Sequence, residues 1–327
     1  MIRRRWLLGG LIASPLLAAA QSLGRRKRIG VIVGQLTTTE VAGPRTLSPA
    51  INALLRGLRE LGWVYGEHFV TEARSSEGKP ERFPALAAEL VALPVDLIVA
   101  LGPAVPALKL ATSTIPIVMT GSGDPVAQGL VQSLARPGGN ITGLTLQSVD
   151  TVGKRLQLLS ELARPAAPIA VLWDRYSLLH WQQAQAAARQ RGWKLLSLQI
   201  GDAAEIEASI AAAREAHAGA LLVFNSALFD PHAARLAAAA AKARLPAMYG
   251  LRSYAHAGGL IAYGPDLVDN WRRAATFVDK ILKGAKPGEL PVEQPTKFEL
   301  VINLKAAQVT GVTIPPSVLL RADEVIE

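Results

Sequence analysis

The sequence contains no cysteine among its 327 residues. Disulfide bonds, thiolate metal sites and catalytic thiols are therefore excluded. A bacterial lipoprotein anchor is excluded as well, because it needs a cysteine directly after its signal. Charged residues are few, at 19%, whereas half of the residues are hydrophobic. This is not the composition of a disordered chain, and at this length it can form two substantial hydrophobic cores.

The chain also lacks the sequence motifs of common catalytic sites. Its five histidines show no metal-ligand spacing such as H-E-x-x-H, and there is no G-x-S-x-G nucleophile elbow. The stretch GSGDPVAQG, residues 121–129, is glycine-rich but contains neither G-x-G-x-x-G nor the lysine of a phosphate-binding loop. We therefore predict that the chain is not an enzyme and that it holds no cofactor and no metal ion.

A strong cluster of positive charge is missing too. The formal net charge is +9, and three of the basic residues lie within the first five positions. The one dense basic cluster elsewhere is RRKR, residues 25–28, and no basic face with aromatic or groove-reading elements is visible. We therefore expect no nucleic-acid partner.

The first 20 residues have the order of a secretory signal peptide. The basic stretch RRR, residues 3–5, precedes an apolar run that ends in small residues at Ala20. We expect cleavage after Ala20 by either the Sec or the Tat route, since RRRWLL also resembles a twin-arginine signal. The alternative is an uncleaved membrane anchor, although the run is short for a membrane span. The mature protein is thus predicted to be periplasmic.

Beyond residue 27, short apolar runs alternate with longer helix-like runs. This alternation predicts an α/β fold with mainly parallel strands. After Ser48 and Pro49, an N-cap and N1 pair, apolar residues recur on one helix face at i, i+3, i+4 and i+7, and the helix is predicted to end before Gly62. Strands are predicted at residues 28–33, 69–74, 95–102 and 115–121.

The same order recurs in the second half of the chain. The strands predicted there are residues 168–174, 193–200, 219–226 and 245–250. One helix is predicted to end at Gly192, and Asp202 with Glu205 forms a capping box for the next. The stretch LRELGW, residues 58–63, matches ARQRGW, residues 188–193, and further stretches match in the same order. We therefore interpret the chain as a duplicated lobe rather than as a chance similarity of α/β units.

The stretch LARPGGNITG, residues 134–143, separates the two halves. Three glycines and a proline within ten residues mark a break in regular structure. Because the break lies where the first repeat ends, we predict that residues 139–145 form a crossover between two lobes. The alternative is an ordinary surface loop.

Several blocks of the sequence resemble one protein family. They are GLRELGWVYGEHFVTEARSSEG (57–78), RFPALAAELVALPVDLIVALG (82–102), ATSTIPIVM (111–119), GDPVAQGLVQSLARPGGNITGL (123–144), KRLQLLSELA (154–163) and the C-terminal residues 263–327. In order and number, these blocks are similar to the extracytoplasmic substrate-binding proteins of ABC transporters, in the subfamily that includes tryptophan- and tyrosine-binding members. The resemblance covers nearly the whole mature chain.

The resemblance implies a type I periplasmic-binding-protein fold, in which two Rossmann-like parallel-sheet lobes are joined by three crossovers and ligand binds in the cleft between them. The expected first lobe comprises residues 27–143 and roughly 267–290, and the second comprises 144–266 and roughly 291–327. The resemblance also implies that this subunit catalyses no reaction, and that its partners are an ABC permease and a cytoplasmic ATPase. We expect the protein to be a monomer.

In open parallel sheets, ligands bind beyond the carboxyl ends of the strands, which selects loops in both halves. The candidates in the first half are Thr37, Thr38, Gly102, Pro103, Ala104, Ser122 and Asp124. The threonine hydroxyls could bind ligand or act as loop and capping groups. Backbone N–H groups at 102–104 could receive a carboxylate, although many family members have Gly-Thr-Pro where this chain has Gly-Pro-Ala. Asp124 followed by proline is typical of an N-cap, and ligand contact is its alternative role.

The candidates in the second half are Asp174, Tyr176, Asn225, Ser226, Tyr249, Tyr263 and Asp266. Asp174 and Asn225 follow apolar strands, where a polar side chain has no packing role, so we expect both to face the cleft and to bind a ligand amine or hydroxyl. Tyr249 and Tyr263 could supply apolar walls with a polar tip, or could pack in a lobe core. Asp266 could cap the helix that follows it rather than bind ligand.

We therefore predict an extracytoplasmic solute-binding protein of an ABC importer, which captures a small organic solute and delivers it to a permease. The resemblance suggests an aromatic or branched amino acid as the solute. An extracytoplasmic sensor that presents ligand to a membrane receptor would share the fold and the cleft. An exported α/β enzyme is a third hypothesis, and the absent site motifs argue against it. A cytoplasmic sugar-type repressor core has a similar fold, but the signal and the lack of a DNA-binding module argue against that function.

Overall fold

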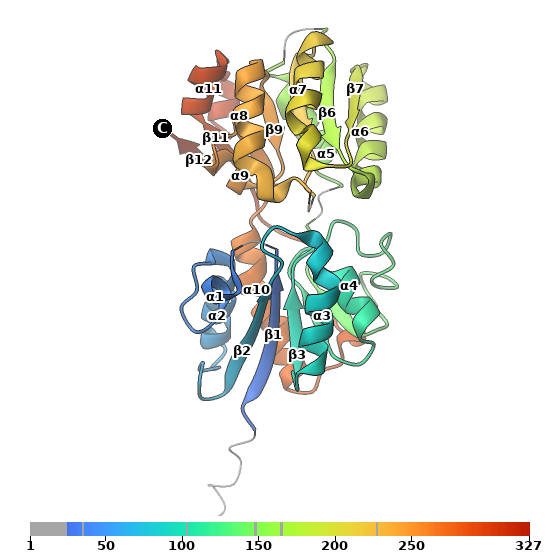
Figure 1. The fold of residues 1–327 in the computed structure, drawn as a ribbon, viewed down its shortest axis with the longest axis vertical. Coiled ribbons are helices and arrows are strands. Elements are labelled where there is room, and N and C mark those ends of the chain that lie inside the picture. Colours follow the sequence, from blue (N-terminus) through green and yellow to red (C-terminus); the bar gives the residue numbers. More distant parts are fainter. Residues whose placement is uncertain (1–24, 35, 103, 147–148, 164–165, 227) are drawn as a thin grey trace, which may run out of the picture.

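The computed structural model describes residues 25–34, 36–102, 104–146, 149–163, 166–226 and 228–327. The expected signal peptide, residues 1–20, lies outside the described residues. The described chain forms two α/β lobes, one above the other in Figure 1. Each lobe is built on its own sheet of mainly parallel strands, which confirms the predicted fold class.

The first lobe, the lower one in Figure 1, contains a five-stranded sheet with the order β2-β1-β3-β4-β5. The strands are β1 (Lys27–Val33), β2 (Phe69–Ser75), β3 (Leu97–Ala100), β4 (Ile117–Met119) and β5 (Ile141–Gly143). All pairs in this sheet are parallel. β3 and β4 are buried along their whole length, because a hydrophobic core lies on each face of the sheet.

Helices α1 (Thr38–Val41), α2 (Pro49–Glu60), α3 (Phe83–Ala92) and α4 (Ala104–Ala111) follow these strands. α2 begins where the sequence predicts, because Ser48 Oγ accepts a hydrogen bond from the Ile51 N–H at 3.3 Å. Its apolar face packs against α10 (Leu267–Leu282), a helix far away in the sequence. Gly57 permits this close packing, since a Cβ there would lie 2.6 Å from the Arg272 carbonyl oxygen.

The second lobe contains a seven-stranded sheet with the order β12-β11-β10-β9-β8-β6-β7. Its strands are β6 (Ile169–Trp173), β7 (Leu195–Gln199), β8 (Ala220–Val223), β9 (Ala247–Tyr249), β10 (Ile261–Pro265), β11 (Phe298–Asn303) and β12 (Glu324–Ile326). Its helices are α5 (Val152–Ser160), α6 (Leu178–Arg191), α7 (Ile206–Glu215), α8 (Ala233–Ala243), α9 (Arg252–His256), α11 (Leu304–Thr310) and α12 (Pro316–Leu319). Among the described strands of this sheet, β10 and β11 make the single antiparallel pair.

The two sheets repeat one topology. The order β2-β1-β3-β4-β5 in the first lobe is matched by β7-β6-β8-β9-β10 in the second. The predicted caps of the second half are present as well: α6 ends before Gly192, whose φ is +70°, and Asp202 and Glu205 form a capping box. This box begins a short 3-10 turn, residues Ala203–Glu205, which leads into α7. The interpretation as a duplicated lobe is therefore confirmed.

The chain passes between the lobes three times. It crosses after β5, again between β10 and α10, and finally between the 3-10 turn Pro287–Glu289 and β11. The first and third crossovers lie side by side, because Leu144 pairs with Glu293 in an isolated parallel bridge. Asn270 on α10 links the first crossover to the loop after β4, since its side-chain amide donates to the carbonyl oxygens of Thr120 and Thr145 at 3.2 and 3.1 Å.

The predicted position of the first crossover, residues 139–145, needs a correction. Residues 141–143 are β5 and pair with β4, so the chain leaves the first sheet only after Gly143. Ile141 is apolar and buried, which favours an added strand at the edge of the sheet. Gly143 makes this pairing feasible, because its φ is +126° and a Cβ there would lie 2.1 Å from the Met119 carbonyl oxygen.

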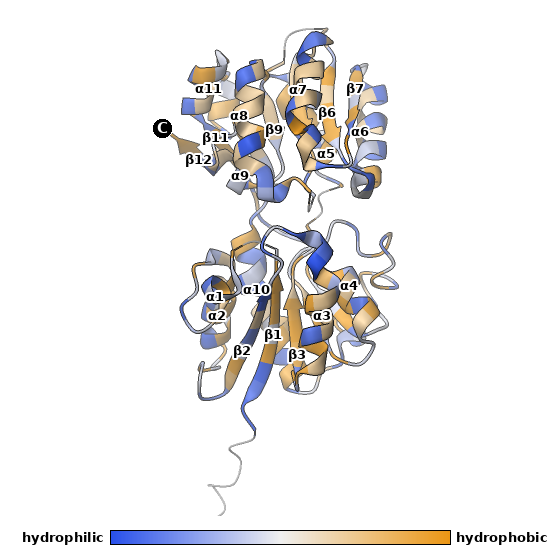
Figure 2. Cartoon of the chain, viewed as in Figure 1, coloured by the Kyte–Doolittle hydropathy of each residue, from blue (hydrophilic) through white to orange (hydrophobic). Residues whose placement is uncertain are grey.

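The hydropathy of the chain follows this architecture. Figure 2 shows mostly hydrophobic residues along β3 and β6, whereas β2 and the helices carry hydrophilic residues as well. Within the residues that the structure describes, none of the helices combines the length and the apolar composition needed to cross a membrane.

Candidate functional site

The carboxyl ends of β1 to β5 in the first sheet and of β6 to β10 in the second meet at the junction of the lobes, whereas β11 and β12 run in the opposite direction. β1 and β3 point toward the second lobe in Figure 1. The loop after β2 touches the loop after β8, since a Cβ on Gly78 would lie 3.4 Å from Pro231 Cβ. The crossovers join the same two lobes elsewhere along this junction. Any space left between the lobes is therefore bounded by elements of both.

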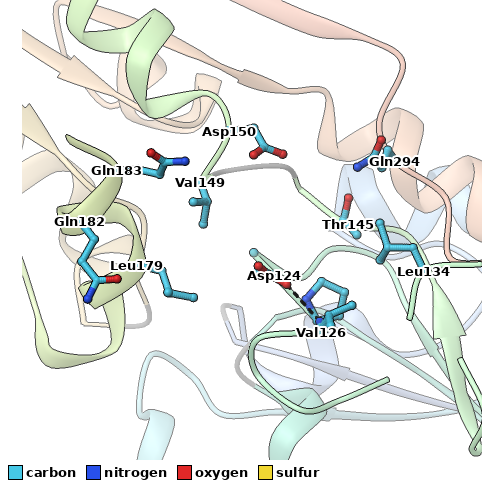
Figure 3. Close-up of a pocket in the computed structure, with 12 residues that line it drawn as sticks. Asp124, Val126, Leu134, Thr145, Val149, Asp150, Leu179, Gln182, Gln183 and Gln294 are labelled. Carbon is cyan, nitrogen blue, oxygen red and sulfur yellow. Dashed lines mark hydrogen bonds between the residues drawn. The ribbon is translucent and has the colours of Figure 1, made fainter. Parts of the chain in front are cut away.

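Such a space is present beside the crossovers, and we call it the interlobe cavity. Its volume is about 410 Å³, within the range of small-molecule sites, roughly 300–1,000 Å³. Figure 3 shows side chains entering it from both lobes and from the crossovers. It is lined by Gly123, Asp124, Pro125, Val126, Leu134, Thr145, Val149, Asp150, Leu179, Gln182, Gln183 and Gln294.

One of the predicted residues, Asp124, lines this cavity. Its Oδ1 accepts hydrogen bonds from the N–H groups of Val126 and Ala127 at 3.1 and 2.9 Å. The predicted capping role is therefore present, although the capped segment is a series of turns and not a helix. Ser122 lies two residues before it and is buried, and its hydroxyl donates to Gln128 Oε1 at 2.8 Å.

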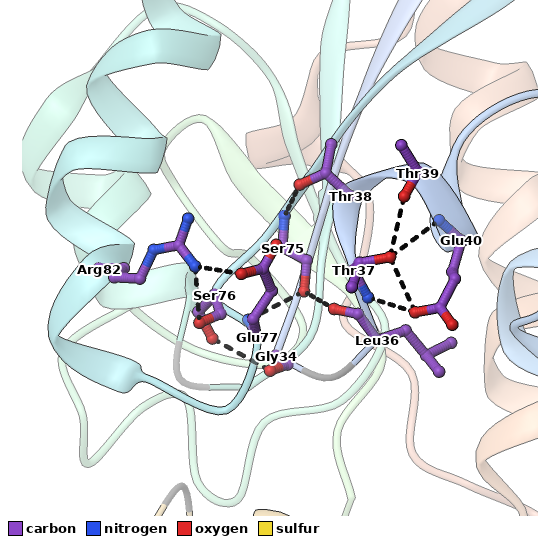
Figure 4. A network of polar contacts seen from close by, with 10 residues as sticks. All are labelled: Gly34, Leu36, Thr37, Thr38, Thr39, Glu40, Ser75, Ser76, Glu77 and Arg82. Carbon is purple, nitrogen blue, oxygen red and sulfur yellow. Dashed lines mark hydrogen bonds and ion pairs between the residues drawn. The ribbon is translucent and has the colours of Figure 1, made fainter.

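The predicted threonines lie in a polar network at the ends of β1 and β2 (Figure 4). Thr37 is the N-cap of α1 and forms a capping box with Glu40. Thr38 Oγ1 accepts a hydrogen bond from the Ser75 N–H at 3.2 Å. Ser75 is itself buried and its hydroxyl donates to the Leu36 carbonyl at 2.6 Å. These contacts correspond to the capping role that the sequence left open, and ligand contact by the threonines stays a prediction.

Gly102 lies in the turn that follows β3, and Ala104 is the first residue of α4. Gly102 has a φ of +35°, and its N–H donates to the Gly121 carbonyl at 2.8 Å. Ala104 is fully buried. Pro103 lies outside the described residues. The Gly102 N–H is thus engaged within the first lobe, and the expected carboxylate contact at this segment stays a prediction.

Asp174 and Asn225 lie where the sequence places them, at the ends of β6 and β8. Asp174 is buried, and its Oδ1 accepts a hydrogen bond from Ser177 Oγ at 2.8 Å. Asn225 packs directly against the chain at Gly250, where a Cβ would lie 1.6 Å from Asn225 Oδ1. Both residues therefore have roles within the second lobe, and their contact with ligand stays a prediction.

The remaining predicted residues of the second lobe are distributed between core and loops. Tyr249 is fully buried in a hydrophobic core and stacks on Tyr254 with 5.0 Å between ring centroids, which is the alternative that the sequence left open. Tyr263 is half-buried and stacks on Phe298. Asp266 caps α10 and pairs with Lys297 at 3.0 Å, as its capping alternative anticipates.

Ser226 and Tyr176 are the last two of the predicted site residues. The Ser226 hydroxyl accepts a hydrogen bond from the Phe229 N–H at 3.3 Å, so it supports the loop after β8. Tyr176 belongs to the 3-10 turn Arg175–Ser177, and its side chain lies outside the described part of the chain.

Arg155, which the sequence analysis did not single out, is fully buried in the second lobe. Its Nε donates to the Tyr263 carbonyl at 2.8 Å, and a second guanidinium nitrogen reaches the Gly250 carbonyl at 3.5 Å. Arg155 thus joins the ends of β9 and β10. The sequence contains an indication of this role. Arg155 shares a helix face with Val152, Leu156 and Leu159, and the apolar periodicity predicts an apolar residue at its position.

Burial perturbs several titratable groups of the second lobe. Burial lowers the pKa of Arg155 to about 10. Burial, together with the charge of Arg155, lowers the pKa of His180 to about 4. Burial raises the pKa of Asp230 to about 6, although a hydrogen bond from the Tyr254 hydroxyl at 2.7 Å opposes this rise. Within the described residues, no group of three or more histidine, cysteine, aspartate or glutamate side chains has the arrangement of a metal site.

Comparison with known proteins gives one consistent result. A family model described as ABC transporter substrate binding protein matches residues 40–326. The chain is 23% identical over 307 residues to a tyrosine-binding protein of Clostridioides difficile, and the match covers 92% of this chain and 86% of that protein.

Solved structures have the same two-lobed fold. A conserved domain protein from Vibrio cholerae has a TM-score of 0.82 at 26% identity, and the match covers 92% of this chain and 100% of that one. The ABC domain of Streptococcus pneumoniae in complex with L-Trp has a TM-score of 0.80 at 24% identity, with the same two coverages. Similar structures also include type I periplasmic binding proteins, such as one from Bordetella pertussis with a TM-score of 0.58.

Proposed function

Since this chain belongs to the ABC transporter substrate binding protein family, we propose that it captures a small organic solute between its lobes and delivers it to a membrane permease. The observation that carries the proposal is the interlobe cavity of about 410 Å³, lined by both lobes and by the crossovers. A solute enclosed there contacts both lobes at once. It therefore favours the closed arrangement by its differential affinity, and a permease could recognise that arrangement.

The proposed solute is an aromatic or branched amino acid. One relative is a tyrosine-binding protein, and one similar structure holds L-Trp. The cavity fits such a solute, because it combines apolar walls at Val126, Leu134, Val149 and Leu179 with carboxylate and amide groups. We propose further that the protein acts outside the cytoplasm as a monomer, without catalysis, together with a permease and a cytoplasmic ATPase.

Mass spectrometry of the purified protein tests this function. Small molecules carried through purification would be released by mild denaturation and identified, and each would then be titrated back by calorimetry. We expect one-to-one binding of an aromatic or branched amino acid, with the compound recovered unchanged. Chemical turnover of the bound compound, or the absence of binding by any amino acid, would contradict the proposal.

A further inference from the structure

We propose that the interlobe cavity recognises the ammonium group of its ligand, which Asp124 of the first lobe and Asp150 of the second hold between them. This inference rests on the proposed function and specifies the chemistry of the same site. Figure 3 shows the two carboxylates on opposite sides of the cavity, with Gln182, Gln183 and Leu179 to one side and Thr145 and Gln294 to the other.

The described lining of the interlobe cavity carries negative charge. Among the described residues that line it, Asp124 and Asp150 are the only charged ones, and none is a lysine, arginine or histidine. The sign of this local charge is opposite to that of the whole chain, which has 35 basic and 26 acidic residues. Cavities lined by one sign of charge concentrate ligands of the other sign. The lining therefore favours a cation.

Both carboxylates keep oxygens that accept no hydrogen bond from the described residues. Asp124 uses Oδ1 for the turn that follows it, which leaves Oδ2 for another donor. Asp150 is exposed at the start of the second lobe and makes neither an ion pair nor a hydrogen bond within the described part of the chain. An ammonium has three donors and can bind both carboxylates through charge-assisted hydrogen bonds.

Thr145 supplies an independent observation that points to a ligand. It lines the cavity and is only 3% exposed, yet its hydroxyl has no hydrogen-bond partner among the described residues. A buried hydroxyl without a partner is costly, and a polar group of the ligand would remove that cost. The backbone of Thr145 is held on both sides, by Glu293 and by Asn270. The backbone that carries this hydroxyl is therefore held in place at the edge of the cavity.

The location of the carboxylates also couples recognition to closure. Two like charges facing each other across the junction repel when the lobes approach, and a bound ammonium converts this repulsion into attraction. Val126 and Leu179 face the cavity from different lobes and are 41% and 39% exposed. Closure around the apolar part of a ligand would bury both of them. The ligand class is thus an amine with an apolar side chain.

A set of three indole compounds tests the inference by calorimetric titration: L-tryptophan, tryptamine, which lacks the carboxylate, and indole-3-propionate, which lacks the ammonium. We expect L-tryptophan and tryptamine to bind, and indole-3-propionate to bind at least about tenfold more weakly. Without the ammonium, the charge-assisted contacts are lost and the two carboxylates are left unpaired. Equal binding of indole-3-propionate and tryptamine would overturn the ammonium assignment and leave the proposed function intact. Failure of all three to bind would count against both.

Two variants and one control test which residues bind the ammonium group. Asp150→Asn should weaken tryptamine binding by about 10- to 100-fold without lowering the melting temperature, because Asp150 has no structural partner among the described residues. Thr145→Val should weaken binding but keep or raise the melting temperature, since it removes an unpaired buried hydroxyl. Glu215→Gln, an exposed position at the end of α7, changes the net charge by the same unit and is the matched control. Wild-type affinity for tryptamine in Asp150→Asn would refute the site.

Discussion

At the scale of single residues, the second lobe combines a buried arginine with glycines that nothing larger can replace. Gly250 is the clearest case, because a Cβ there would lie 1.6 Å from Asn225 Oδ1 and 2.8 Å from Arg155 Cζ. Gly264 is similar, since its Cβ would lie 1.8 Å from the Gly250 carbonyl oxygen. The backbone, Asn225 and Arg155 therefore share one tightly filled space at the ends of β8, β9 and β10.

The variant Gly250→Ala should destabilise the protein by at least about 1–3 kcal/mol, the usual cost of overpacking, because Asn225 and Arg155 must both move. Gly139→Ala is the control, as nothing lies within 4 Å of its Cβ position. Chemical denaturation of both variants measures the difference. Equal stabilities would mean that the space around Gly250 relaxes freely.

The pKa of Asp230 leads to a prediction about pH. Burial raises this pKa from 3.8 to about 6, so the folded state binds a proton more tightly than the unfolded state. Stability from this group is full below about pH 4 and is lost as the pH rises through 6, by about 3 kcal/mol at most. Asp230→Asn should therefore gain stability relative to the wild type between pH 4 and pH 7. Melting curves across that range test this, and a constant difference would contradict it.

His180 has the opposite effect on the pH dependence of stability. Burial, together with the charge of Arg155, lowers its pKa from 6.5 to about 4, so its contribution is present above pH 6.5 and is lost as the pH falls to 4. The two contributions offset each other over much of this range in the wild type. The Asp230→Asn variant should consequently show a steeper loss of stability toward acid than the wild type.

At the scale of secondary-structure elements, α10 decides how the crossovers meet the first lobe. It packs along α2 through Trp271, Ala274 and Ala275, and Asp266 caps its first turn. Asn270 is 1% exposed on the same helix, and its amide donates to carbonyl groups of the loop after β4 and of the first crossover. One side chain on this helix thus links two segments that the sequence separates widely.

Asn270→Leu should lower the free energy of unfolding by about 1–3 kcal/mol for each carbonyl left without a donor. We expect weaker ligand binding as well, because Thr145, whose carbonyl is one of the two acceptors, lines the interlobe cavity. Lys280→Ala, at an exposed position of the same helix, is the control. Denaturation together with titration of the ligand separates the two effects, and an unchanged stability would contradict the structural role.

At the scale of the whole molecule, the lobes are joined by the crossovers and touch again between the loops after β2 and β8. The contact between Gly78 and Pro231 does not involve the crossovers, and its Cβ separation of 3.4 Å is close to that of a disulfide, about 3.5–4.5 Å. The natural chain has no cysteine, so an engineered pair has no competing thiol. This contact is therefore suited to locking the lobes together.

The double variant Gly78→Cys, Pro231→Cys should form a disulfide under oxidising conditions and hold the two lobes in the arrangement seen in this structure. We expect the oxidised protein to bind and release ligand more slowly than the reduced protein, because exchange needs the lobes to separate. Stopped-flow exchange before and after addition of a reductant measures this, with the single variant Gly78→Cys as the control for strain at a φ of +77°. Equal exchange rates in both redox states would mean that ligand exchanges without opening.

The sequence by itself determined the local structure and the repeat. The caps at Ser48, Gly192 and Asp202 depend on contacts within a few residues, so their side chains and spacing are sufficient to predict them. The alternation of apolar runs likewise predicted two parallel sheets, because both faces of such strands are buried. The roles of Thr37 and Asp266 as caps were among the alternatives for the same reason.

Tertiary structure alone decided which residues meet at the interlobe cavity. Asp150, Gln182 and Gln294 come from the segment before α5, from α6 and from the crossover before β11, and no local pattern relates their positions. The burial of Arg155 and the close contact of Gly250 with Asn225 likewise depend on how α5 packs beneath β8 and β9. The physical reason is that caps and periodicity are set by neighbours along the chain, whereas a cavity is set by how whole lobes pack and where their crossovers run.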